Sequence, residues 1–419
     1  MVKIVNMVNI ENKYTPALRF PDFLNEGEWE VKRLGEIVKE VEEKCSIGKL
    51  DIDTYISTEN MLQNLEGVKK ASKLPETGSF TRFQKGDILF SNIRPYLKKV
   101  WQAEFEGAAS NDVIVFRAQT EYDSGFVSQI IKSDSFIAHT MAGAKGVKMP
   151  RGDKNMMLEF PVCVPCLSEQ RRIAQALTAL DELIAGTNEK LEQMKAYKKG
   201  LMQKLFPAKG KKLPELRFKE FEKAGEWTVK GLGEFVDVFQ GYGFPERMQG
   251  KTRGKYPFIK VSDISMTVNN GGKYIDVANN YVDEEDLPIL GATPFPFGTI
   301  VFAKIGEAIR LNRRVILSKP SLIDNNVGGV KAKDGLSNDD FVFYIMSMID
   351  LVKYAGGVVP AVKKTTIENI EVLMPPTLDE QQKIAEVLTS IDRTIMQKTK
   401  KTNLLKKYKK GLMQQMFVN

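Results

Sequence analysis

Repetition of long stretches constrains the fold of this 419-residue chain more than any other feature of its sequence. Three pairs of stretches share most of their letters: "PALRFPDFLNEGEWEVKRLGE" (16–36) and "PELRFKEFEKAGEWTVKGLGE" (214–234), "EQRRIAQALTALD" (169–181) and "EQQKIAEVLTSID" (380–392), and "KKGLMQKLF" (198–206) and "KKGLMQQMF" (409–417). Repeats at such regular spacing indicate two copies of one structural unit in a single chain.

The segments between these repeats are much less alike. Only "GDILFSNIRP" (86–95) resembles "GTIVFAKIGE" (298–307), and Asn-Asp at 111–112 takes the place of Asn-Asn at 325–326. Short runs of β-forming residues, broken by Gly, Pro and Asn, predict a compact globule in the first part of each unit. A repeated frame with divergent middles is typical of a protein with two independently specified working surfaces.

The last part of each unit is predicted to be one long helix. Apolar residues follow a 4-3-4-3 spacing over 173–205 and again over 384–416, which is typical of the seam of a coiled coil. Ser168 and Asp379 are the predicted N-caps. The predicted seam residues are Ile173, Leu177, Leu180, Ile184, Leu191, Leu201, Leu205, Ile384, Leu388, Ile391, Ile395, Leu405, Leu412 and Met416.

Two lysines interrupt the apolar seam. Lys198 and Lys409 belong to the repeated "KKGLMQ" phrase and fall on seam positions by the heptad count. Gly200 and Gly411, in the same phrase, interrupt sequences that otherwise favour helix. We expect the phrase to serve the packing of the helices or the docking of a partner.

These patterns divide the chain into successive segments. They are an N-terminal extension (1–13), a first globular domain (14–167), a first long helix (168–206), a linker (207–212), a second globular domain (213–377) and a second long helix (378–419). Because the linker is short, the second domain must begin near the C-terminal end of the first helix.

The second helix then buries its seam most simply against the first, running antiparallel to it. The predicted fold is therefore α+β, with two globular domains separated by two long helices that form an antiparallel coiled coil with pseudo-two-fold symmetry. The alternative is that each helix packs on its own globule.

Composition narrows the class of protein. The formal net charge of +8 favours an acidic partner such as nucleic acid. Three cysteines without a secretory signal indicate a reducing compartment, and the longest apolar run, 341–349, is too short to cross a membrane. We therefore expect a cytoplasmic protein that does not cross the membrane.

The order and duplication of these features resemble the specificity subunit of type I restriction–modification enzymes, over essentially the whole chain from Pro16. The resemblance is carried by the duplicated "EQxxIAxxL" and "KKGLMQ" phrases, by "FSNIRPYLKKVW" and "GAKGVKMPRGDKN" in the first globule, and by "GYGFPERMQGK", "FAKIGEAIRLNRR" and "IDNNVGGV" in the second. It implies that each globule is a target-recognition domain for one part of a split DNA site. It also implies that the helices set the distance between the two parts and bind two methyltransferase subunits, with restriction (motor–nuclease) subunits joining the larger complex.

The same resemblance implies that double-stranded DNA is the ligand and that this chain binds no cofactor, since S-adenosylmethionine, ATP and Mg²⁺ would be held by the partner subunits. Basic residues interleaved with glycine and aromatic residues are the candidates for contacts to phosphates and bases. They are Arg82, Arg94, Lys98, Lys99, Lys145, Lys148, Arg151, Lys251, Arg253, Lys304, Arg310, Arg313, Arg314, Lys363 and Lys364. For Arg94 and Lys304, a role in the internal structure of the domain is the alternative.

Motifs for catalysis are missing from the sequence. "NIRPY" (92–96) lacks the adjacent prolines of an adenine methyltransferase motif, and "GFPERMQGKT" (243–252) has its glycines too far apart for a phosphate-binding loop. Cys163 and Cys166 have the spacing of a redox or zinc pair, but the repeat places methionine and threonine at the same positions. We interpret the two cysteines as small buried residues at a strand-to-helix junction.

Two other functions stay open at this point. Asp22, followed by Glu42, Glu43 and Lys44, forms an acidic–lysine pattern that resembles a metal-dependent nuclease site, although only the first unit contains it. A protein-binding scaffold built on the coiled coil is the second alternative. Salt-sensitive binding to duplex DNA separates a DNA-recognition protein from such a scaffold. The hypothesis we favour is a non-catalytic DNA-recognition subunit.

Overall fold

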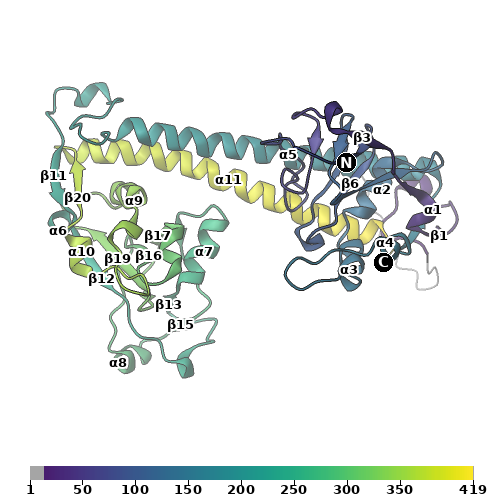
Figure 1. Cartoon of the computed structure of the whole chain (residues 1–419). Helices are drawn as coiled ribbons and strands as arrows, with labels where there is room; N and C mark the ends of the chain where they lie inside the picture. Colours follow the sequence, from purple (N-terminus) through teal and green to yellow (C-terminus); the bar gives the residue numbers. More distant parts are fainter. Residues whose placement is uncertain (1–13, 419) are drawn as a thin grey trace. The chain divides into compact units, whose positions relative to one another are not determined.

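The computed structural model describes residues 14–418, apart from the side chain of Lys49 (Figure 1). The predicted N-terminal extension (1–13) lies outside the described residues. Short strands and helices form the globular parts, and one long helix follows each of them (Figure 1), which confirms the predicted α+β class. In the described part of the chain, no helix combines the length and the apolar character that a membrane crossing requires.

Two long helices of equal length follow the two globules. Helix α5 (Leu167–Leu205) and helix α11 (Leu378–Met416) each contain 39 residues, which corresponds to about 58 Å at 1.5 Å per residue. The predicted N-caps Ser168 and Asp379 are wrong, because both lie inside the first helical turn. In α11 the capping residue is Thr377, whose hydroxyl oxygen accepts a hydrogen bond from the amide three residues later at 3.3 Å.

The compact units of the structure divide both long helices. The first unit extends to Gly186 and resumes at Leu404, and the second unit is Thr187–Asn403. Each unit therefore combines one globule, the N-terminal part of the helix that follows it and the C-terminal part of the other helix. The sequence patterns place a boundary between each globule and its helix. In the structure the globule and the start of the helix pack together, because the first turns of each helix contribute side chains to the globular core.

Among its described residues, the first unit contains three small sheets. The central sheet has the antiparallel order β2-β9-β6-β7, the second sheet has the order β3-β5-β8-β4 with β4 parallel to β8, and β1 pairs with β10. Its strands are β1 (Glu30–Arg33), β2 (Val38–Glu40), β3 (Lys44–Ser46), β4 (Tyr55–Ile56), β5 (Ser79–Phe83), β6 (Ile88–Ser91), β7 (Val100–Gln102), β8 (Gly107–Ala109), β9 (Val113–Ala118) and β10 (Pro161–Val164). Its helices besides α5 are η1 (Pro21–Phe23), α1 (Leu34–Ile37), η2 (Ile47–Lys49), η3 (Pro95–Leu97), α2 (Ser124–Ile131), α3 (Asp134–Ala142) and α4 (Lys154–Leu158).

The second unit repeats this plan with additions. Its central sheet has the order β12-β19-β16-β17-β14, a small sheet has the order β15-β13-β18, and β11 pairs with β20 as β1 does with β10. Its strands are β11 (Thr228–Gly231), β12 (Val236–Gln240), β13 (Tyr256–Ile259), β14 (Tyr274–Ile275), β15 (Tyr281–Val282), β16 (Ile300–Ala303), β17 (Arg314–Leu317), β18 (Leu322–Ile323), β19 (Val327–Ala332) and β20 (Glu371–Met374). Its helices besides α11 are η4 (Lys219–Phe221), α6 (Leu232–Phe235), η5 (Glu246–Met248), α7 (Val261–Asn269), α8 (Asp286–Leu290), η6 (Glu307–Leu311), α9 (Asp339–Met348), η7 (Leu351–Tyr354) and α10 (Lys364–Glu368).

The β-forming runs at 86–95 and 298–307 supply the interior strands β6 and β16, as their sequences predict. Every residue of both strands is buried. Strand β6 lies between β9 and β7, and β16 lies between β19 and β17, so both faces and both edges of each strand are covered. Continuous apolar runs of this kind are expected of strands that solvent does not reach.

Each repeated stretch that begins with "KKGLMQ" ends in a phenylalanine that packs against a globular core. Phe206 stacks on Phe341 of α9 with ring centroids 5.6 Å apart, and Phe417 stacks on Phe126 of α2 at 5.5 Å. Phe206 is buried and Phe417 is half-buried; full burial of an aromatic side chain contributes about 1.5–3 kcal/mol, so the contribution of Phe417 is smaller. Each copy of the phrase therefore ends in a hydrophobic anchor that attaches a helix end to a globule.

The two lysines of the predicted seam are paired with aspartates. In the second unit, Lys198 of α5 lies 2.6 Å from Asp392 of α11, and Asp392 also accepts a hydrogen bond from Tyr344 at 2.7 Å. In the first unit, Lys409 of α11 lies 2.7 Å from Asp181 of α5. The seam tolerates both lysines because the facing helix segment supplies a counter-charge at the same level.

Within each unit, the two helix segments run antiparallel. In the second unit, Leu205 at the end of α5 shares a hydrophobic cluster with Ile384 near the start of α11. In the first unit, Met416 at the end of α11 shares a cluster with Ile173 near the start of α5. Of the predicted seam residues, those buried are Ile173, Leu177, Leu191, Leu205, Ile384, Leu388, Ile391 and Met416, and those half-buried are Leu180, Ile184, Leu201, Ile395, Leu405 and Leu412.

A buried ion pair connects the start of each long helix to its globule. Arg217 donates two hydrogen bonds to the carboxylate of Glu380, at 2.8 Å each, and the indole of Trp227 donates a third at 3.1 Å. Arg19 makes the same two bonds to Glu169, at 2.7 Å each. Both carboxylates are 1% exposed, and the hydrogen bonds they accept raise the pKa of both arginines.

Replacing Glu380 by alanine should destabilise the second unit by about 3–5 kcal/mol, because Arg217 would keep a buried charge without its partner. Urea denaturation of the full-length chain measures the loss as a lower unfolding midpoint. Glu368→Ala is the matched control: it removes the partner of the more exposed Lys364 and should cost about 1 kcal/mol or less. Equal shifts for the two variants would contradict the anchoring role of Glu380.

Candidate nucleic-acid interface

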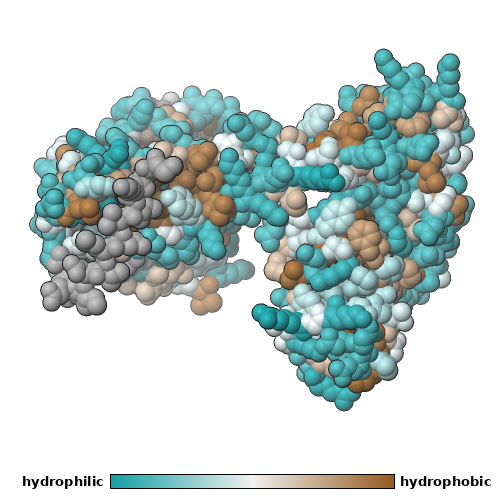
Figure 2. Space-filling model, turned by 180° about the vertical axis from the view of Figure 1, so that it is seen from behind, coloured by the Kyte–Doolittle hydropathy of each residue, from teal (hydrophilic) through white to brown (hydrophobic). Residues whose placement is uncertain are grey.

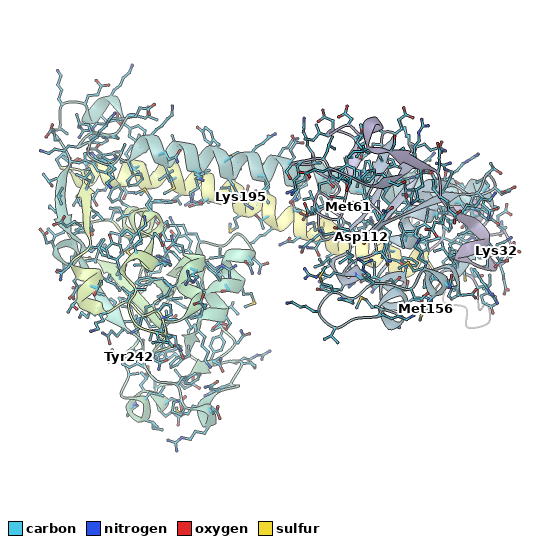
Figure 3. All side chains as sticks on the ribbon, viewed as in Figure 1. Lys32, Met61, Asp112, Met156, Lys195 and Tyr242 are labelled. Atoms are coloured by element: carbon cyan, nitrogen blue, oxygen red, sulfur yellow. The ribbon has the colours of Figure 1, made fainter. Side chains whose placement is uncertain are left out.

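Two loops of the first unit leave one end of the central sheet side by side. Strands β6 and β9 are antiparallel, so the end of β6 faces the start of β9. We call the segments at this end the β6–β7 loop (92–99) and the β8–β9 turn (110–112). The amide of Asn92 donates a hydrogen bond to the carbonyl of Asp112, labelled in Figure 3, at 2.8 Å. Asp112 belongs to the pair at 111–112 that faintly resembles 325–326 in sequence. This pair lies beside β6, the strand predicted from the likeness of 86–95 to 298–307.

The α3–α4 loop (143–153) joins these two segments. The amide of Arg94 donates to the carbonyl of Pro150 at 2.8 Å, and the amide of Gly152 donates to the carbonyl of Asn92 at 3.2 Å. The loop runs from the end of α3 at Ala142 to the start of α4 at Lys154. Backbone hydrogen bonds thus hold three loops, which are distant in sequence, in one surface.

The second unit builds the same surface from different residues. The amide of Lys304 donates to the carbonyl of Asn326 at 2.9 Å, and the amide of Gly306 donates to the carbonyl of Pro360 at 2.8 Å. These bonds match those of Asn92 and Arg94 in the first unit. The three corresponding segments are the β16–β17 loop (304–313), the β18–β19 turn (324–326) and the η7–α10 loop (355–363).

A group of basic side chains lies beside the β6–β7 loop without acidic partners. Burial lowers the pKa of Lys99, and the nearby charges of Arg94 and Lys69 lower it further. Among the described residues, none of these three side chains forms a salt bridge, although the Lys99 ammonium donates to the carbonyl of Thr58 at 2.5 Å. Glu59 offsets part of this charge, but the three cations leave a net positive charge that attracts an anion such as a phosphate. Lys69 is not among the residues predicted from the sequence, where its only signal is the lysine-rich run at 69–73.

The other predicted residues of the first unit are mostly paired with acids. Lys98 contacts Asp134, Lys145 lies 3.3 Å from Asp153, and Arg151 lies 2.9 Å from Asp112. Lys148 is exposed and, within the described part of the chain, has no acidic partner. The predicted residues on the β6–β7 and α3–α4 loops come together in one surface, and they are Arg94, Lys98, Lys99, Lys145, Lys148 and Arg151.

Arg82 lies apart from this surface. It is on β5 in the second sheet of the unit, where its guanidinium pairs with Glu43 at 3.3 Å and with Glu106 at 3.8 Å. A DNA contact by Arg82 stays a prediction that the arrangement of the three loops does not support.

The predicted residues of the second unit fall into three groups. Burial lowers the pKa of Lys304 on the β16–β17 loop. Lys363 is its neighbour in this surface. The amide of Val362, the residue before Lys363, donates a hydrogen bond to the Lys304 carbonyl at 2.9 Å. Lys251 lies elsewhere, beside β15, and pairs with Asp283. The remaining predicted residues and their bonding partners are Arg310 with Glu307, Lys364 with Glu368 and Arg313 with Asn269, while Arg253 is exposed.

Arg314 is a wrong prediction, because its side chain is buried. It begins β17, an interior strand of the five-stranded sheet, and its guanidinium lies 5.1 Å from the centre of the Phe302 ring. It donates to the side chain of Asn312 at 2.8 Å and to the carbonyl of Arg313 at 2.9 Å. Burial lowers the pKa of Arg314 to about 10, so it keeps its charge at neutral pH. The side chain is therefore enclosed by the domain and is 5% exposed.

The two cysteines of the C-x-x-C pattern differ in exposure. Cys163 is half-buried on β10, where burial raises the pKa of its thiol, while Cys166 precedes α5 and is exposed. The interpretation that both are buried is therefore wrong for Cys166, which occupies the helix-capping position that Thr377 takes in the second unit. The two thiols are free.

The residues of the acidic–lysine pattern take part in separate interactions. Asp22 lies in the short helix η1, whereas the Lys44 ammonium donates to Thr81 at 2.9 Å and to Asn111 at 3.4 Å. Across residues 14–418, no three His, Cys, Asp or Glu side chains gather in a group that would hold a metal ion.

Comparison with known proteins agrees with this architecture. The family described as "Type I restriction modification DNA specificity domain" matches residues 26–196 and 224–407, one match in each half of the chain. The chain belongs to this family, the specificity subunits of type I restriction–modification systems.

One relative of known name spans nearly the whole chain, and another spans about three fifths of it. The type I restriction enzyme MjaVIII specificity subunit of Methanocaldococcus jannaschii is 26% identical over 99% of this chain and 96% of its own length. The putative MjaX specificity subunit of the same organism is 29% identical over 62% of this chain and 59% of its own length. The crystal structure of the S subunit from M. genitalium matches the fold with a TM-score of 0.65, at 16% identity, over 96% of this chain and 99% of that one.

Arg314→Met should leave the salt dependence of duplex binding unchanged, because a buried guanidinium neutralises no phosphate. The measurement is the slope of log K against log salt concentration for the full-length chain and a duplex. A slope reduced by about 0.9 would mean that Arg314 contacts one phosphate after all.

Proposed function

We propose that this chain recognises a bipartite DNA target, with one three-loop surface in each unit contacting one half of the site. The observation that supports this most directly is the equivalent construction of the two surfaces. Their loops are fixed by the same backbone hydrogen bonds, whereas the side chains differ. Equal frames with unequal side chains are what two half-sites of different sequence require.

The charges of the two surfaces suit a duplex. Arg94, Lys99 and Lys69 in the first unit supply positive charge that Glu59 offsets only in part, and Lys304 and Lys363 supply positive charge in the second, where the described residues form no salt bridge with either. Phosphate contacts of this kind position a protein on DNA, while neighbouring polar and apolar groups contact base edges. Paired residues such as Arg151 can still donate to a base or phosphate, since an arginine has five N–H donors.

The long helices are proposed to form an antiparallel coiled coil that fixes the distance between the two half-sites. The antiparallel segments within each unit and the paired seam lysines support this role. A rigid spacer is needed because the separation of two half-sites on a duplex is fixed along and around its axis. A flexible Gly/Ser linker would leave that separation undefined.

The partners in this proposal are two methyltransferase subunits and the restriction subunits, which would carry S-adenosylmethionine, ATP and Mg²⁺. The chain itself would be non-catalytic and cytoplasmic. Tyr197 and Tyr408 occupy equivalent positions next to the two "KKGLMQ" phrases and are 60% and 54% exposed. Exposed tyrosines are enriched in protein interfaces, so these two positions are candidates for methyltransferase docking.

Lys99→Met should weaken binding to every duplex, specific or not, and reduce the salt slope by about 0.9, because one phosphate contact is lost. Fluorescence anisotropy titrations of the full-length chain at several salt concentrations measure both quantities. Lys195→Met is the control: Lys195 is an exposed lysine of α5 (Figure 3), paired with Glu192, and its loss should change neither. Binding that does not respond to salt would favour a protein-binding scaffold instead.

A heptad inserted after Gly186 in α5, with a second heptad after Asn403 in α11, should lengthen the target without altering its two half-sequences. Seven residues add about 10 Å of helix, which corresponds to about 3 base pairs at 3.4 Å each. Methylome sequencing of cells that carry the variant with its methyltransferase subunits measures the spacer. Altered half-sequences with an unchanged spacer would refute the role of the helices.

A further inference from the structure

The two projecting loops of the candidate interfaces are closed in the same way. In the α3–α4 loop, Lys145 and Arg151 exchange two backbone hydrogen bonds of 2.9 Å. In the η7–α10 loop, Gly356 and Ala361 exchange two of 3.1 Å. Each loop is therefore a small closed turn on a fixed base, and the two sequences share a Gly-Val pair and a later proline.

Each closed turn begins with a glycine followed by a fully exposed valine. Gly146 and Gly357 have φ angles of +97° and +92°, in the region that favours glycine. The next residues, Val147 and Val358, are 103% and 104% exposed. A side chain at either glycine would also lie 3.2–3.3 Å from a carbonyl oxygen across the turn. The glycine fixes the turn so that the valine occupies its tip.

A single exposed apolar side chain needs no explanation, and Figure 2 shows apolar residues scattered among hydrophilic ones on the visible face. The two tips differ from such scatter in three respects. They occupy equivalent positions within the segments where the two halves are least alike, they are held by hydrogen-bonded bases, and a second exposed apolar side chain accompanies each. The companions are Met149, 51% exposed, and Val359, 61% exposed.

The surroundings of the tips are cationic. The base of the first turn is bonded through Pro150 to Arg94, which lies near Lys99, and Lys148 lies within the turn itself. The second turn is bonded to the β16–β17 loop, which carries Lys304. An apolar tip surrounded by cations matches a nucleic-acid groove, where phosphates line the rims and base edges form the floor.

We propose that Val147 and Val358 enter a groove of the duplex and contact base edges, one in each half-site, as specificity-determining residues. Thymine methyl groups and base steps are the apolar features that a groove offers to such a side chain. The proposal rests on the bipartite recognition proposed above, and it assigns to each half-site an apolar contact in addition to the basic ones.

The experiment uses the full-length chain with its methyltransferase subunits and duplexes that carry the target found by methylome sequencing. Val147→Ser should weaken binding to the target about ten-fold and reduce discrimination against changes in the first half-site by a similar factor. Discrimination at the second half-site should not change. Val358→Ser should show the reverse, and neither substitution should alter the salt slope, because neither removes a charge.

Val31→Ser and Val229→Ser are matched controls, because these valines are also exposed and also occupy equivalent positions, on β1 and β11. Both should bind the target within two-fold of the parent chain. If the parent chain shows sequence preference and the Val147 and Val358 variants keep it within two-fold, the valine contacts are refuted while bipartite recognition stands. If the parent chain shows no sequence preference, the proposed function fails and the valine contacts fail with it.

Discussion

The buried arginine–glutamate pair at the start of each long helix is the interaction on which the rest of the structure depends. A buried carboxylate persists only where its desolvation is offset by charge-assisted hydrogen bonds, and Glu169 and Glu380 receive two each from Arg19 and Arg217. The pair joins the segment before the first strand of a unit to the first turn of the helix that follows its last strand. It thereby closes each globule and sets where the helix leaves it.

The repeated and divergent parts of the sequence follow from this division of roles. Residues of the frame meet fixed partners: an arginine meets a glutamate, a lysine meets an aspartate and a phenylalanine stacks in a core, so few alternatives preserve the geometry. The loops of the candidate interfaces are held by hydrogen bonds of the backbone, and any residue except proline can donate such a bond. Their side chains are therefore free to differ between the two units, and two surfaces of different specificity can be carried by one architecture.

The seam lysines illustrate how a polar group can specify a packing arrangement. Lys198 and Lys409 occupy positions where an apolar residue would suit the helix–helix contact. Each is neutralised by an aspartate on the other helix segment of its unit, at 2.6 Å and 2.7 Å. A shift of one heptad would leave both charges without partners in a partly buried site, which is costly. The pairs therefore favour one register of the two segments.

The sequence by itself determined the duplication, the long helices, the seam positions and the interior strands β6 and β16. These follow from local periodicity and from comparison of one half of the chain with the other, and neither depends on long-range contacts. The family could also be inferred from the order of the motifs.

Only the tertiary structure decided which basic residues lie together on the surfaces of the three loops. Arg313 and Arg314 are adjacent in sequence, but Arg313 ends the β16–β17 loop and is half-buried, whereas Arg314 begins the buried interior strand β17. Lys69 joins Arg94 and Lys99 through a fold that brings distant loops together. The closed turns that carry Val147 and Val358 likewise depend on hydrogen bonds between segments far apart in the chain. Local sequence patterns carry no record of such contacts, because they depend on where the folded backbone places each loop.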